Sequence, residues 1–134
     1  MIYSIDVAVT APVADTEVED RVADAITNVF PNAEVTYGDR ELAATTHSVE
    51  AFRDRLFEQR ILDTARGALL SNREGNTVAF DLKKQAAFKG VVNFAVGKPD
   101  ELGEIHVEIT VEDPAVEEFV DYLAPRTEDG KPVE

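Results

Sequence analysis

Residues 2–10 alternate apolar and polar side chains, and this alternation constrains the fold more than any other stretch of the chain. The apolar residues lie at every second position: Tyr3, Ile5, Val7 and Val9. Because successive side chains of a strand point to opposite faces of its sheet, one face of this strand is predicted to be buried and the other exposed. A sheet built from such strands has helices on one side and solvent on the other.

Helical signals follow. Thr16 and Glu19 form a T-x-x-E capping box ahead of an apolar series at helical spacing, and Pro31 ends that helix. Ser48 is the predicted N-cap of a middle helical region that extends to Leu69. The spacing of its apolar residues fits one bent helix or two.

Further strands are predicted where short apolar runs lie between turn residues, at residues 33–37, 41–46, 77–82, 91–96 and 104–111. A short helix carrying Val116, Phe119, Val120 and Leu123 follows Asp113-Pro114. The polar tail, residues 124–134, contains proline and glycine and is predicted to be irregular.

The resulting order, β-α-β-β-α-β-β-β-α, predicts an α+β fold: an open, mainly antiparallel sheet with helices packed on one face. The 134 residues are of a size for one domain, and a hydrophobic content of 44% is enough to fill its core. We therefore expect residues 1–134 to form a single domain.

Several classes of protein are disfavoured. The chain has no cysteine, so it has neither disulfides nor a thiolate zinc site. The opening MIYSIDVAVTAP lacks a basic leader, and no apolar run approaches the length that spans a bilayer. We expect a cytoplasmic protein that does not bind membranes.

An enzymatic function is also disfavoured. Only His47 and His106 are of a type to act as a base near neutral pH, and neither lies in a recognisable catalytic motif. His106 and Glu108 form an H-x-E pair without a third metal ligand at diagnostic spacing. We expect no catalytic residue, no metal and no cofactor.

The chain carries 27 acidic and 13 basic residues, a net charge of -14. One interpretation is an acidic protein that repels nucleic acid. The other is adaptation to concentrated salt, which the low lysine content favours. At molar salt the Debye length is about 3 Å, so charges matter chiefly at contact distance.

The basic residues are concentrated in the middle of the chain. Residues 53–89 hold eight of the thirteen basic residues and five of the 27 acidic ones. The stretch FDLKKQAAFKGVVNF, residues 80–94, overlaps the end of this segment and has no acidic residue after Asp81. Arginine binds phosphate through paired donors, Gln85 can contact a base or ribose edge, and Phe88 can stack. The alternative is that the arginines balance neighbouring acids and Phe88 lies in the core.

Several stretches resemble an archaeal family of uncharacterised proteins to which RNA binding is attributed. They are APVADTEVEDRVADAITNVFPNA, FRDRLFEQRILDTARGALL, FDLKKQAAFKGVVNF, LGEIHVEI and FVDYLAPRTEDGKPV, and together they span nearly the whole chain. The acidic, lysine-poor composition is similar to that of a haloarchaeal member. The family in turn resembles, in fold, the ribosomal protein that binds the small RNA of the large subunit.

The resemblance implies an RNA ligand, structured and of ribosomal type. The residues assigned to RNA contact are Arg53, Arg60, Arg66, Arg73, Lys83, Lys84, Gln85 and Lys89. Asp63 is expected to pair with Arg60 or Arg66 and to orient the guanidinium. Replacing Lys83 and Lys84 by alanine is expected to weaken RNA binding and to leave the melting temperature nearly unchanged.

The sequence thus predicts a non-enzymatic RNA-binding protein whose basic middle segment forms one exposed patch. The alternative is a protein-interaction module or a homodimer joined at a sheet edge, without a nucleic-acid ligand.

Overall fold

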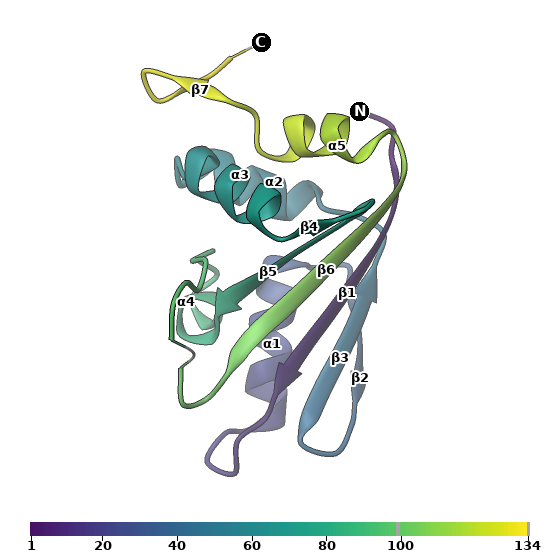
Figure 1. Ribbon diagram of the computed structural model, residues 1–134. Helices are drawn as coiled ribbons and strands as arrows, with labels where there is room; N and C mark the ends of the chain where they lie inside the picture. Colours follow the sequence, from purple (N-terminus) through teal and green to yellow (C-terminus); the bar gives the residue numbers. More distant parts are fainter. Residues whose placement is uncertain (99, 134) are drawn as a thin grey trace.

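The computed structural model describes residues 1–98 and 100–133, which form one α+β domain (Figure 1). Its six-stranded sheet has the spatial order β2-β3-β1-β6-β5-β4, with antiparallel neighbours throughout. The strands are β1 (Ser4–Pro12), β2 (Glu34–Tyr37), β3 (Glu41–Thr46), β4 (Arg73–Glu74), β5 (Thr77–Lys83) and β6 (Glu104–Asp113). The helices are α1 (Glu19–Val29), α2 (Glu50–Glu58), α3 (Leu62–Ser71), α4 (Lys84–Phe88) and α5 (Val116–Leu123). The predicted fold class is confirmed.

The long strands β1 and β6 lie side by side at the centre of the sheet. Val7 is paired with Ile109 and Val9 with Val107, and all four side chains are buried. The intervening residues of both strands point to the other face, where they are exposed or half-exposed. The predicted alternation is therefore confirmed, and it gives the sheet one face against the helices and one open face.

Phe52 of α2 stands at the centre of the core. Its ring stacks on Phe30 and on Phe80, with centroid distances of 5.2 and 5.4 Å, and Phe94 meets it edge-on. This cluster joins α2 to the end of α1, to β5 and to the segment after α4. Such aromatic pairs stabilise a core beyond the apolar area that they bury.

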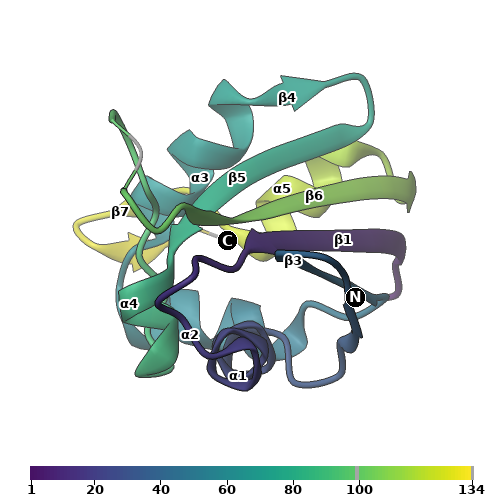
Figure 2. The same cartoon turned by 90° about the horizontal axis from the view of Figure 1, so that it is seen from below.

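The predicted strand at residues 91–96 is wrong. Only an isolated bridge joins Leu82 to Phe94, and the lysine segment before it forms α4, which lies against α1 (Figure 2). Val92 and Phe94 alternate as a strand would because both are buried against the core. The Gln59 side chain bonds both the backbone N–H and the carbonyl of Val92, at 2.9 and 2.7 Å, where a neighbouring strand would otherwise do so.

The predicted helix starts are also corrected. α1 begins at Glu19 and α2 at Glu50, with Val18 and Val49 at the N-cap positions and no side-chain cap at either. Instead of the Thr16 capping box, the Glu17 carboxylate accepts a hydrogen bond from the Ala14 N–H at 2.9 Å.

The middle helical region consists of two helices, α2 and α3. They are separated at Arg60, whose φ of 58° lies in the left-handed region and interrupts the helix. The tail that was predicted to be irregular contains a short hairpin of β7 (Thr127–Glu128) and β8 (Lys131–Pro132). This hairpin lies beyond α5, at the end of the molecule where α2 and α3 lie (Figure 1).

Candidate nucleic-acid interface

Lys84 is not available to a ligand, because only 3% of its surface is exposed. Its ammonium group donates hydrogen bonds to Glu17 Oε1 at 2.9 Å, to the Leu102 carbonyl at 2.6 Å and to the Pro12 carbonyl. All three ammonium protons are thus used within the protein. The assignment of Lys84 to RNA contact is corrected: it ties α4 to the β1–α1 loop and to the loop before β6.

Arg66 and Arg73 form ion pairs with α5. Arg66 lies 2.7 Å from Asp121 and also donates to the Ala124 carbonyl, while Arg73 lies 2.6 Å from Glu117. For these two arginines the alternative interpretation, that cations balance neighbouring acids, describes the structure. Their guanidinium groups hold α5 against α3 and β4.

The expected pairing of Asp63 is wrong. Asp63 Oδ1 accepts a hydrogen bond from the Thr127 hydroxyl at 2.5 Å, and Arg66 is paired with Asp121 instead. Asp63 therefore connects the start of α3 to the C-terminal hairpin and does not orient an arginine.

Arg53 is enclosed between two aromatic rings. Its guanidinium carbon lies 4.4 Å from the centroid of the Phe57 ring and 4.2 Å from that of Tyr122, and its Nε donates to the Tyr122 carbonyl at 2.8 Å. A half-buried guanidinium in such a stack is held by cation–π attraction on both sides. Arg53 thus positions Phe57.

Lys83, Gln85 and Lys89 are exposed around α4. Lys83 and Lys98 line a shallow hollow of about 280 Å³ together with Asp100 and Glu104. Phe88 is half-buried and packs against the core, with the Arg21 guanidinium 5.5 Å from its ring centroid. The segment therefore presents exposed cations, but Phe88 is largely a packing residue.

Arg60 lines a different hollow, which shares no residue with the one at Lys83. This hollow, called here the hairpin pocket, has a volume of about 390 Å³ and lies between the α2–α3 turn and the C-terminal hairpin. Its walls are Phe57, Arg60, Leu62, Asp63, Thr127, Asp129, Gly130, Lys131 and Pro132. The predicted single patch is thus divided, with Arg60 apart from the α4 lysines.

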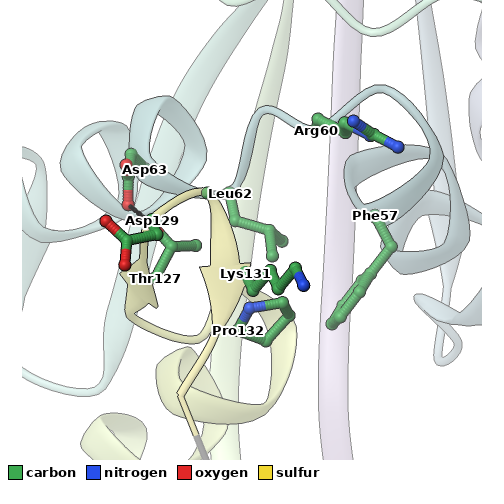
Figure 3. A pocket seen from close by; sticks show the side chains of 9 residues that line it. Phe57, Arg60, Leu62, Asp63, Thr127, Asp129, Lys131 and Pro132 are labelled. Carbon is green, nitrogen blue, oxygen red and sulfur yellow. Dashed lines mark hydrogen bonds between the residues drawn. The ribbon is translucent and has the colours of Figure 1, made fainter.

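The hairpin pocket is polarised (Figure 3). The carboxylates of Asp63 and Asp129 lie on one side, whereas the Lys131 ammonium points toward the Phe57 ring on the other, with Arg60 above it. An anion is favoured on the Arg60–Lys131 side, and hydrogen-bond donors are favoured on the aspartate side.

Of the walls of this pocket, only Arg60 and Asp63 were given a role in the site from the sequence. The tail that was predicted to be irregular supplies Thr127, Asp129, Gly130, Lys131 and Pro132. The Asp129-Gly130 pair was the available signal, because both residues have positive φ and form the hairpin turn that carries Lys131.

The open face of the sheet is rich in carboxylates. Its outward positions include Asp6, Glu34, Glu41, Asp81, Glu104 and Glu108. The two histidines are engaged here: His106 Nδ1 lies 2.7 Å from Asp81, and His47 Nδ1 lies 3.1 Å from Asp6. The field of this face opposes the approach of phosphate.

Two features are absent from residues 1–98 and 100–133. No cluster of three or more histidine or acidic side chains there is arranged to hold a metal ion. None of the helices in these residues has the length and apolarity needed to cross a membrane.

Glu50 accepts hydrogen bonds from two tyrosines that support the Arg53 stack. The Tyr3 and Tyr122 hydroxyls donate to its carboxylate at 2.8 and 2.9 Å. The hydrogen bond from Tyr3 is the main reason that the pKa of Glu50 is lowered. Partial burial, followed by the bond to Glu50, raises the pKa of Tyr122 to about 12.

We expect this arrangement to make the free energy of unfolding decrease at alkaline pH. Tyr122 ionises near its ordinary pKa of 10.0 in the unfolded chain but near 12 in the folded protein. The contribution of Tyr122 to the free energy of unfolding is therefore complete below about pH 10, and it is lost as the pH rises toward about 12. Urea unfolding should show the stability difference between wild type and Tyr122→Phe shrinking over that range. A difference that stays constant would contradict the proposed environment of Tyr122.

Comparison with known proteins decides the family. Residues 6–111 match a protein family described as "RNA binding". The chain is 40% identical over 137 residues to the UPF0201 protein of Thermococcus kodakarensis, with 96% of each chain covered. The chain belongs to the archaeal UPF0201 family.

Other UPF0201 relatives agree in sequence and fold. The chain is 37% identical to a UPF0200/UPF0201 protein of Archaeoglobus fulgidus, of which it spans only 40% of the length. The crystal structure of a UPF0201 protein from Methanococcus jannaschii is similar, with a TM-score of 0.89 at 36% identity. That likeness covers 96% of this chain and 99% of the other.

Proposed function

We propose that this UPF0201 protein is a non-enzymatic RNA-binding protein that contacts RNA at the hairpin pocket. The observation that carries the proposal is the placement of Arg60 and Lys131 beside Phe57 in one hollow. None of the walls of this hollow comes from the acidic six-stranded sheet. The description of the family as RNA-binding supports the same ligand.

Arginine and lysine give this surface the chemistry that RNA phosphates require. The planar guanidinium of Arg60 offers paired donors, which remain effective when salt screens long-range attraction. Lys83, Gln85 and Lys89 are proposed as outer contacts, because they are exposed around α4. Arg53, Arg66, Arg73 and Lys84 are proposed to act through the fold. Adaptation to concentrated salt and a ribosomal RNA partner remain proposals.

Arg60→Glu is expected to weaken RNA binding about tenfold or more. A hydrogen bond to a charged group contributes about 1.5–3 kcal/mol, and reversing the charge adds repulsion. The measurement is fluorescence anisotropy of a labelled single-stranded RNA, titrated with protein in potassium chloride at several concentrations.

Arg40→Glu is the matched control. Arg40 is also exposed and also has a positive φ, of 60°, but it lies in the β2–β3 turn. Its replacement should leave the affinity unchanged. If Arg60→Glu and wild type bound RNA with equal affinity, the hairpin pocket would be excluded as the RNA-binding site. A wild-type protein that binds no RNA would overturn the function and favour the protein-interaction alternative.

A further inference from the structure

The aromatic stack at α2 borders the hairpin pocket through Phe57. Tyr122, Arg53 and Phe57 follow one another at 4.2 and 4.4 Å between the guanidinium and each ring centroid. Phe57 also lines the hairpin pocket, whereas Arg53 and Tyr122 do not. The Phe57 ring thus contacts the Arg53 guanidinium and also borders the pocket.

The other walls suit an unpaired nucleotide. Leu62 and Pro132 give apolar surface near the ring, and the Lys131 ammonium points toward it (Figure 3). Arg60 lies above Phe57, at a distance from the aspartates. The volume of about 390 Å³ is within the range of small-molecule sites, which begins at roughly 300 Å³.

We propose that the hairpin pocket takes one unpaired base of a single-stranded RNA, stacked on Phe57 opposite Arg53. The flanking phosphates lie at Arg60 and Lys131. This inference rests on the proposed RNA-binding function and specifies the part of RNA that the site accepts. Because every base has a π face, stacking of this kind tolerates any sequence but requires the base to be free of a duplex.

Arg53 has a positioning role in this arrangement. Held by the Tyr122 ring and carbonyl, it fixes Phe57 before the base arrives, so little side-chain freedom is lost on binding. The hairpin then supplies the opposite wall, and the hydrogen bond between Thr127 and Asp63 keeps it beside α3.

A single fluorophore can test the inference, because the chain contains no tryptophan. Phe57→Trp places an indole in the pocket, and Tyr37→Trp places one on the exposed strand β2 as the matched control. On titration with oligouridylate, the fluorescence of the Phe57→Trp variant should be quenched to a plateau, and that of the Tyr37→Trp variant should not change. A duplex RNA of the same length should leave both signals unchanged.

Phe57→Leu supplies the second measurement. It keeps an apolar side chain but removes the π face, and we expect single-stranded RNA to bind about tenfold or more weakly. Circular dichroism and thermal melting check that each variant is folded. If the Phe57→Trp variant does not fold, the RNA affinity of Phe57→Leu tests the inference instead.

The outcomes separate the inference from the function on which it rests. RNA that binds to both tryptophan variants without quenching the indole in the pocket, or that binds Phe57→Leu with full affinity, overturns the stacking while RNA binding stands. Equal quenching by duplex and single strand overturns the requirement for an unpaired base. Failure of the wild type to bind any RNA overturns both.

Discussion

Lys84→Met is expected to lower the free energy of unfolding by about 3–5 kcal/mol, the usual result of removing one partner of a buried ion pair. Methionine has a similar length, so the main effect is the loss of the ammonium group. The Glu17 carboxylate, 8% exposed, then remains in the interior without its cation, and the Pro12 and Leu102 carbonyls lose a donor. Urea unfolding followed by circular dichroism measures the change.

Neighbouring variants identify the cause. Lys83→Met, one residue earlier and exposed, should change stability by no more than about 0.5 kcal/mol. Adding Glu17→Leu to Lys84→Met should recover part of the loss, because the unpaired carboxylate is then absent. A Lys84→Met protein as stable as Lys83→Met would contradict the buried pair. The sequence-based expectation that a Lys83 and Lys84 double alanine variant melts normally is corrected on the same grounds.

Phe52→Ala is expected to destabilise the protein by about 3–5 kcal/mol, as large-to-small changes of buried aromatic residues do. Phe52 is 1% exposed and touches three other phenylalanine rings from separate segments of the chain. Its removal leaves a cavity that those rings cannot fill without moving the backbone. Thermal and urea unfolding measure the loss.

Phe88→Ala is the comparison for Phe52→Ala. Phe88 is the last residue of α4 and is only half-buried, so its replacement should destabilise the protein clearly less. Phe52→Leu should fall between wild type and Phe52→Ala, because it leaves a smaller cavity. Similar losses for Phe52→Ala and Phe88→Ala would show that the stacked rings are not the centre of the core.

The strands and helices could be predicted wherever their periodicity reports burial. Residues 2–10 and 104–111 alternate because the central strands have one covered face, and this gave both the sheet and its open side. The same alternation misled at residues 91–96, where Val92 and Phe94 are buried but only an isolated bridge between Phe94 and Leu82 joins the segment to β5. Periodicity indicates which side chains are buried, but it does not indicate which groups form hydrogen bonds with the backbone.

The site was harder to predict because charge in a sequence does not reveal exposure. Lys84 and Lys83 are adjacent, yet one is buried and the other is not. The spacing of Lys84 and the buried Ala87, three residues apart on α4, was the only local sign. The hairpin pocket could not be foreseen, because its walls lie more than 60 residues apart and meet through the Asp63–Thr127 bond.

The pairing of β1 with β6 affects how the chain folds during synthesis. Ile5 is paired with Val111, so the central ladder of the sheet joins segments that are made about 100 residues apart. Until β6 has left the ribosome, β1 can pair only with β3, and its other edge stays unprotected against association with nascent neighbours. Contacts of such long range slow the final closure of a sheet, so the synthesis of β6 controls when the domain becomes native.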